Sequence, residues 1–384
     1  MCFRKYQYQW ASESCVNDQQ QILLMKMNLS LLAFVVLSIV DVGFLSGSAH
    51  AQNIDVAYRV LDTTQVMGNG GTDYVYADND GRKVYVPRGD RTYVFDLDSH
   101  QLIATIAGIS GHGVAVDPES HHGFSSGHQI GMFDTVTLQK IKDIAVQGRP
   151  DGILFEPFTK RIYVFSHVSP NITVIDPKEG TVVGTIDLGG APEQAQSDGA
   201  GKVYVDVEDE KKIAVVDVKS MKLITKYDLG QTAGATKGLG LDAKNHILFA
   251  MCSNPNVCVV VNADDGKILT TLPIGNGTDG GDFNPNTIEA FSSQRDGTLT
   301  IIKENSLSSF TVEQTVQTKP GCRTSTLDTK NNHIVLICTE HAPQVAGTAS
   351  PTPDATAGSR PWGGGHGGLG NLDVLFVGRR SNQL

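Results

Sequence analysis

The chain has 384 residues, of which 41 are glycine, 15 are proline and 7% are aromatic, and its formal net charge is −10. This composition is typical of a turn-rich all-β protein and disfavours a helical one. The negative charge, without a basic stripe carrying interleaved aromatic residues, argues against nucleic acid and anionic membrane surfaces as partners.

The N-terminal segment has the pattern of an export signal. Lys26 precedes an apolar run at residues 29–40, and the small residues 48–51 follow it. This order is typical of a secretory signal peptide, here residues 25–51. Asp41 shortens the apolar run below the roughly 18 residues needed to span a bilayer. We therefore favour a periplasmic or extracellular protein, without membrane insertion after cleavage, over a retained membrane anchor.

Residues 1–24 are polar, show no periodicity and fit neither a signal peptide nor the repeats that follow. We favour a translation start at Met25 or Met27, so that the upstream segment is an artefact of the assigned start. The alternative is a genuine extension that buries the signal and keeps the protein in the cytoplasm.

One pattern recurs seven times in residues 52–384, at intervals of 39 to 44 residues. Each copy contains short runs of β-branched and aromatic residues separated by Pro, Gly, Asn and Asp. In the third copy the runs are residues 151–155, 161–165, 171–176 and 181–186. Four antiparallel strands at this period predict a seven-bladed β-propeller of four-stranded blades.

The last copy offers only three strands, near residues 323–328, 334–338 and 373–377. Residues 58–61 have no strand partner of their own and resemble the fourth strand of the other copies. We predict that this N-terminal strand completes blade seven, which hides strand edges that would otherwise pair with other chains.

The predicted third strands end in a residue with a short polar side chain. These residues are Asp96, Asp134, Asp176, Asp217 and Asn262. Such side chains commonly accept a hydrogen bond from the backbone two residues on and stabilise a turn. We therefore interpret them as hairpin residues and not as catalytic carboxylates.

The second to fourth strands resemble a known group of bacterial proteins. Residues 84–86 (Val-Tyr-Val) and 162–164 (Ile-Tyr-Val), with Ile-Thr-Val-Ile-Asp at 172–176 and the segment 180–190, are similar to the YVTN-type repeats of YncE-like proteins. The resemblance covers about residues 56 to 380. It implies a propeller in which the innermost strand of each blade starts at the wider mouth of a central channel. It implies no activity, because lactonases and quinoprotein dehydrogenase subunits share the propeller shape.

A polar or charged residue occupies the start of the first strand in every copy. The seven residues are Asp73, His112, Asp151, Glu193, Lys237, Asp279 and Arg323. In the geometry that the resemblance implies, they converge on the channel mouth and form a candidate ligand-binding ring. The competing interpretation is a ring of solvated polar residues at a water-filled funnel, where apolar groups would be exposed.

The order of these residues around the ring distinguishes one carboxylate with cationic neighbours from a continuous acidic arc. Asp279 lies between Lys237 and Arg323, so we expect a structural role for it. The candidate metal ligands form the arc and are Asp73, His112, Asp151 and Glu193. Carboxylates held close together repel unless they share a cation or a proton. Their oxygens and one imidazole suit a divalent cation such as Ca²⁺ or Mn²⁺, or a cationic or polyhydroxyl ligand.

Loops between the second and third strands are expected to surround the mouth, and His128, His167 and Arg295 lie in them. In blade seven this loop is a Pro- and Gly-rich insertion, residues 341–370. Its composition favours disorder over a lid. If it is a lid, Trp362 and His366 are the residues that reach over the channel.

Four cysteines follow the signal peptide and form two candidate disulfides. Cys252 and Cys258 flank one predicted hairpin turn, and Cys322 and Cys338 flank another. An oxidising compartment favours a bond in each pair if the Cα atoms lie within about 4.4 to 6.8 Å. Four free thiols are the alternative, and a zinc site is disfavoured because paired CxxC spacing is missing.

No motif identifies a reaction, since G-x-S-x-G, H-E-x-x-H and P-loop patterns are missing from the sequence. The favoured hypothesis is an exported propeller that binds a small molecule, a peptide or a partner protein at the channel mouth, without chemistry. The alternative is a lactonase-like hydrolase in which the acidic arc holds a divalent metal that polarises an ester, lactone or phosphate. We favour binding because no nucleophile or base can be singled out.

Overall fold

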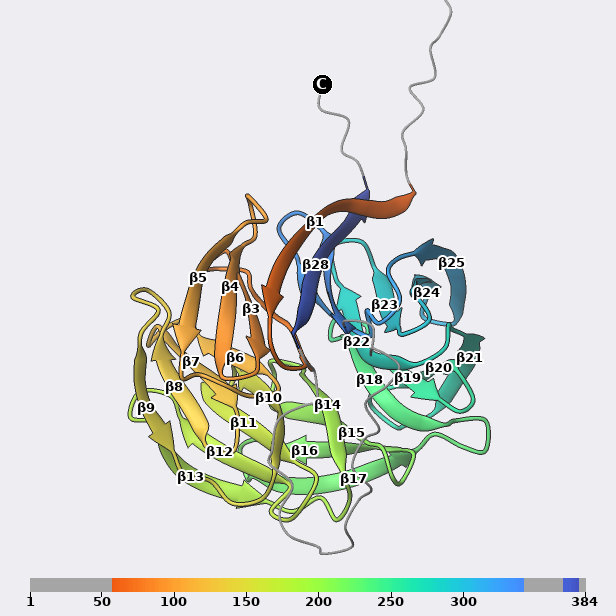
Figure 1. Ribbon diagram of the computed structural model, residues 1–384. Helices are drawn as coiled ribbons and strands as arrows, with labels where there is room; N and C mark the ends of the chain where they lie inside the picture. The colour runs from red at the N-terminus through yellow and green to blue at the C-terminus, as the bar shows by residue number, and fades with distance from the viewer. Residues whose placement is uncertain (1–56, 342–368, 380–384) are drawn as a thin grey trace, which may run out of the picture. The chain divides into compact units, whose positions relative to one another are not determined.

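The computed structural model describes residues 57–341 and 369–379, which form seven four-stranded antiparallel sheets (Figure 1). The predictions for residues 1–24, for the signal peptide at 25–51 and for Trp362 and His366 fall outside the described residues. In the described part of the chain, no helix is long and apolar enough to cross a membrane.

Blades one to six each take four consecutive strands. Blade one contains β2 (Tyr76–Asp78), β3 (Lys83–Arg88), β4 (Arg91–Asp96) and β5 (Leu102–Ala107). Blade two contains β6 (Val114–Asp117), β7 (His122–Ser126), β8 (Ile130–Asp134) and β9 (Lys140–Ile144). Blade three contains β10 (Pro150–Glu156), β11 (Arg161–Ser166), β12 (Ile172–Asp176) and β13 (Thr181–Ile186).

The next three blades repeat this order. Blade four contains β14 (Pro192–Ser197), β15 (Lys202–Val207), β16 (Lys212–Asp217) and β17 (Lys222–Asp228). Blade five contains β18 (Ala235–Asp242), β19 (Ile247–Ser253), β20 (Val257–Asn262) and β21 (Ile268–Pro273). Blade six contains β22 (Thr278–Asn284), β23 (Glu289–Gln294), β24 (Thr298–Ser306) and β25 (Ser309–Gln317).

Blade seven joins the two ends of the described chain. It contains β26 (Thr324–Asp328), β27 (His333–His341), β28 (Gly370–Arg379) and β1 (Tyr58–Gly68). β1 pairs antiparallel with β28, from Tyr58 opposite Arg379 to Gly68 opposite Gly370, as Figure 1 shows. The prediction that an N-terminal strand completes the last blade is confirmed, and the strand is longer than residues 58–61.

The core is divided among the spaces between neighbouring blades. Alternation along β11 sends Tyr163 toward Val205 of blade four, and Ile162 toward Phe124 of blade two. Middle strands are therefore buried on both faces, which explains why their sequences are continuously apolar. The first strands contact one another in a closed cycle, in the order β2, β6, β10, β14, β18, β22, β26 and back to β2. This cycle surrounds the central channel.

The carboxylates at the ends of the third strands stabilise turns, as the sequence predicted. Asp176 accepts hydrogen bonds from the backbone N–H groups of Lys178 and Glu179 at 2.9 and 3.3 Å. Asp96 accepts from the backbone N–H of Ser99 at 2.6 Å. These side chains therefore cap their own hairpins.

The structure confirms one of the two expected disulfides and contradicts the other. Cys322 and Cys338 are bonded, with their Cα atoms 4.2 Å apart. Cys252 and Cys258 are free and buried, so the second expected disulfide was wrong. Cys258 lies opposite Met251 in the register of β19 and β20, one residue away from Cys252. Because side chains alternate across a sheet, an offset of one residue sends the two thiols to opposite faces.

Candidate functional site

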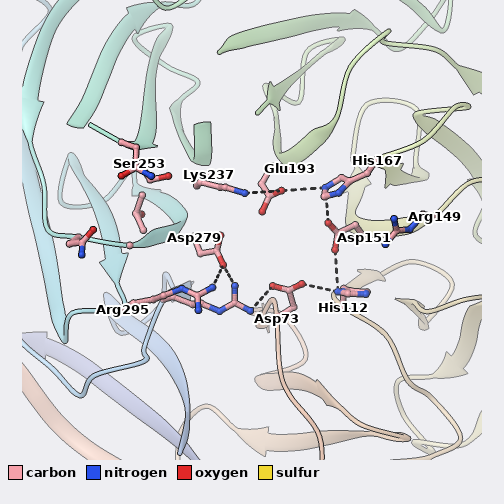
Figure 2. Close-up of a pocket in the computed structure, with 15 residues that line it drawn as sticks. Asp73, His112, Arg149, Asp151, His167, Glu193, Lys237, Ser253, Asp279 and Arg295 are labelled. Atoms are coloured by element: carbon pink, nitrogen blue, oxygen red, sulfur yellow. Dashed lines mark hydrogen bonds and ion pairs between the residues drawn. The ribbon is translucent and has the colours of Figure 1, made fainter. Parts of the chain in front are cut away.

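All seven residues predicted for the channel mouth line one pocket of about 440 Å³ (Figure 2). Three other charged or titratable side chains line it as well: Arg149, His167 and Arg295. His128, which the sequence placed near the mouth, is not among the lining residues. The innermost strands of all seven blades thus contribute to a single polar cavity.

In blades three, four and six, irregular pairing in the first strand directs the ring side chain into this pocket. In blade three the register jumps between Pro150 and Ile153, which leaves Asp151 without a cross-strand partner in the ladder. The same kind of jump lies at Glu193 and Asp279 in blades four and six. A β-bulge bends its strand and re-aims a side chain. Local sequence therefore positions these carboxylates at the channel mouth.

One side of the ring is a compensated cluster of ions. Asp279 forms an ion pair with Arg323, and Arg295 Nη2 lies 3.5 Å from Asp279 Oδ2. Arg323 Nη2 also lies 3.2 Å from Asp73 Oδ1, so one guanidinium bridges two carboxylates. Lys237 was expected to flank Asp279, but its ammonium pairs with Glu208. Asp279 is therefore compensated by Arg323, as predicted, and by Arg295 in place of Lys237.

The other side of the ring alternates carboxylates with histidines, as the dashed lines in Figure 2 show. His112 Nδ1 lies 2.7 Å from Asp73 Oδ2 and 3.2 Å from Asp151 Oδ1. His167 Nε2 lies 3.0 Å from Asp151 Oδ2 and 3.3 Å from Glu193 Oε2. The sequence predicted one imidazole within the arc and placed His167 in a surrounding loop. In the structure His167, from the loop after β11, also lies between Asp151 and Glu193.

These contacts shift the ionisation of the ring. Ion-pair contacts with Asp151 and Glu193 raise the pKa of His167 to about 10. Burial opposes protonation of His112, but Asp73 and Asp151 outweigh it and the pKa of His112 is raised. Burial also acts to raise the pKa of Asp151, yet both imidazoles outweigh it and hold that pKa below its usual value. The pKa of Glu193 is raised, mainly by burial.

The raised pKa of His167 makes stability depend on pH. Its protonated form stabilises the folded state fully below the unfolded pKa of about 6.5, and this stabilisation is lost as pH rises through about 10. Between these values we expect the free energy of unfolding to fall more steeply in the wild type than in His167→Gln. Urea unfolding of both proteins across this range, with a chelator present so that His167 is metal-free, measures the difference. Parallel pH profiles would contradict the assigned ionisation.

Next to the ring residue Glu193, Gln194 links the innermost strands of neighbouring blades. Gln194 Nε2 donates to the carbonyl of Gly281 at 2.9 Å, and its Oε1 accepts from the N–H of Leu239 at 2.9 Å. One side chain of blade four thus bridges the innermost strands of blades five and six. A Cβ added at Gly238 would lie 2.4 Å from the backbone of Gly280, so only glycine permits this close approach. A smaller cavity of about 200 Å³ lies next to Glu193 and Gln194.

No protein-family model and no curated protein matches this chain. Many solved chains share its fold. One belongs to a structure described as "Crystal Structure of Mitotic Checkpoint Complex", with 13% sequence identity and a TM-score of 0.63, covering 79% of this chain and 96% of that chain. At this identity the likeness shows the β-propeller fold alone.

Proposed function

We propose that this protein binds a small polar ligand in the pocket at the channel mouth. The observation that carries the proposal is the convergence of one charged or polar side chain from each of seven blades on one cavity. The cavity volume of about 440 Å³ lies in the range of small-molecule sites, which are usually lined by apolar groups. The charged lining of this one favours a ligand with hydroxyl groups or with charges of both signs.

Two finer assignments accompany this proposal. The sequence resemblance supports a YncE-like protein with YVTN-type repeats, and the signal-like segment at residues 25–51 supports a periplasmic or extracellular location. Propellers share their shape across many functions, so the occupant is argued from the pocket and not from the fold. A peptide terminus or a side chain of a partner protein is the other occupant that the pocket admits.

Thermal unfolding with a panel of compounds tests the proposal. The panel contains amino acids, hydroxy acids, dicarboxylates, sugars and short peptides, all with a chelator present. A ligand at about 100 times its dissociation constant should add roughly 2.7 kcal/mol to the free energy of unfolding. Arg323→Met should lose this stabilisation. Arg161→Met is the matched control, because Arg161 pairs with Asp176 at a hairpin outside the pocket. A panel without any stabilising compound would count against the proposal.

A second candidate is metal-dependent hydrolysis, as in a lactonase-like enzyme. Two groups of residues favour it. In each group, one imidazole and two carboxylates place their ligand atoms within 4.8 Å of one another. These groups are Asp73 with His112 and Asp151, and Asp151 with His167 and Glu193. Hydrolysis of model lactones and esters that a chelator abolishes would support this candidate, and metal-independent ligand binding would favour the first.

A further inference from the structure

We propose that the pocket contains a binding site for one divalent transition-metal ion, formed by Asp151, His167 and Glu193. The inference does not depend on which organic ligand the pocket takes. It differs from the acidic arc that the sequence suggested, because it includes His167 and omits Asp73 and His112. The three residues come from blades three and four, and their ligand atoms lie within 4.8 Å of one another.

The spacing of these atoms matches a coordination sphere. Two ligands at about 2.1 Å from an ion lie roughly 3.0 to 3.4 Å apart when the angle between them is tetrahedral or octahedral. His167 Nε2 is 3.0 Å from Asp151 Oδ2 and 3.3 Å from Glu193 Oε2. The nitrogen is therefore at ligand spacing from each of the two oxygens, and all three atoms lie within 4.8 Å of one another.

Burial gives an independent indication of a missing partner. Asp151 and Glu193 are only 9% and 7% exposed. Within the described part of the chain, His167 Nε2 and Asp151 Oδ1 are buried atoms without a hydrogen-bond partner. Asp151 Oδ1 is the oxygen that faces His112, so His167 Nε2 is the atom that bears on this site. The carboxylate oxygens of Asp151 and Glu193 lie at ion-pair distance from this nitrogen but outside hydrogen-bond geometry. Buried polar atoms are rarely left in this state, and a bound ion satisfies them.

The other imidazole group is already committed. Asp73 Oδ2 pairs with His112 Nδ1 at 2.7 Å in a hydrogen bond, and Asp73 Oδ1 lies 3.2 Å from the guanidinium of Arg323. Both oxygens of Asp73 therefore have partners, and an ion there would have to displace a cation. Glu193 has a weaker competitor, since Lys237 Nζ is 3.9 Å away and pairs with Glu208. Because its carboxylates are less firmly paired with cations, the group that contains His167 is the better candidate for the metal site.

The donor set indicates the class of ion. One imidazole nitrogen and two carboxylate oxygens suit Mn²⁺, Fe²⁺ or Zn²⁺, whereas Ca²⁺ prefers six to eight oxygen ligands. Three protein ligands leave at least one coordination position open. The three residues line the polar pocket, so a carboxylate or hydroxyl group of a ligand bound there could complete the sphere.

Titration with Co²⁺ tests the site directly, because cobalt bound to nitrogen and oxygen ligands absorbs visible light. We expect one Co²⁺ per chelator-treated protein, and we expect Zn²⁺ to displace it. His167→Ala and His167→Asn should each weaken Co²⁺ binding by at least about 100-fold. His128→Ala is the matched control, because His128 lies in the equivalent loop of blade two and outside the pocket.

Two outcomes would overturn the metal site. One is wild-type protein that binds no Co²⁺, and the other is folded His167→Ala and His167→Asn proteins with wild-type Co²⁺ affinity. Asp73→Asn distinguishes this site from the acidic arc, which includes Asp73. If the arc binds the metal, Asp73→Asn should weaken Co²⁺ affinity as much as we expect for His167→Ala. Our site predicts a loss of Co²⁺ affinity at least about tenfold smaller. Stabilisation by the compound panel in chelator would leave the ligand-binding proposal standing even if the metal site fails.

Discussion

A protein that lacks residues 57–68 is expected not to fold into a monomeric propeller. The deletion removes β1, which pairs with β28 along its full length. The edge of β28 would become exposed, and Tyr58, Val60 and Val66 of β1 would no longer pack in the hydrophobic clusters on the two sides of blade seven. The total stability of a native protein is only about 5 to 15 kcal/mol, and losing one strand of the closing blade exceeds that margin.

Side-chain bonds make the loss extend beyond blade seven. The hydroxyl of Tyr58 donates to Glu289 at 2.5 Å, and Gln314 bonds both the N–H and the carbonyl of Tyr58. β1 therefore joins blade six to blade seven. Size-exclusion chromatography and circular dichroism of the deletion should show aggregated or unfolded protein, and a synthetic peptide of residues 57–68 should restore the monomer. A monomeric deletion protein that melts like the wild type would refute this account of ring closure.

Asp328→Ala is expected to lower the free energy of unfolding by about 3 to 5 kcal/mol. Asp328 of blade seven is fully buried and receives both terminal nitrogens of Arg82 of blade one, at 2.7 and 2.8 Å. It also accepts hydrogen bonds from the backbone N–H and the side chain of Asn331. Its removal leaves a guanidinium without its main partner at the boundary where the ring closes.

Asp98→Ala supplies the matched control, because Asp98 is the other carboxylate partner of Arg82. Its side chain is 51% exposed, and exposed ion pairs contribute only about 0 to 1 kcal/mol. Urea unfolding of the two variants should therefore show a large loss for Asp328→Ala and a small one for Asp98→Ala. Equal losses would mean that the buried pair does not join blades one and seven.

The blade count, the closing strand and the mouth ring were all predictable because each depends on local sequence. Strand runs and turn residues recur with the repeat period, and the ring residue falls near the start of the first strand in every blade. Asp151 and Glu193 directly follow Pro150 and Pro192, at the point where the strand register jumps. Because the bulge recurs with the sequence repeat, the side chains at the bulges point into one pocket.

The features that the sequence did not predict depend on long-range geometry. The sequence placed His167 in a loop near the mouth, but not between Asp151 and Glu193, where the loop after β11 brings it to the first strands of blades three and four. No spacing along the chain specifies that reach. The free thiols of Cys252 and Cys258 follow from a register offset of one residue between β19 and β20, which a hairpin pattern in the sequence does not fix.

The most direct test of a single site at the channel mouth is calorimetric titration of the best stabilising compound into variants from different blades. Asp151→Asn, Lys237→Met and Arg323→Met alter blades three, five and seven. We expect each to weaken affinity by at least about tenfold while the protein remains folded, because each removes a charged hydrogen-bonding group from the same pocket. Wild-type affinity in all three variants would show that the ring is solvated polar surface and that the ligand binds elsewhere.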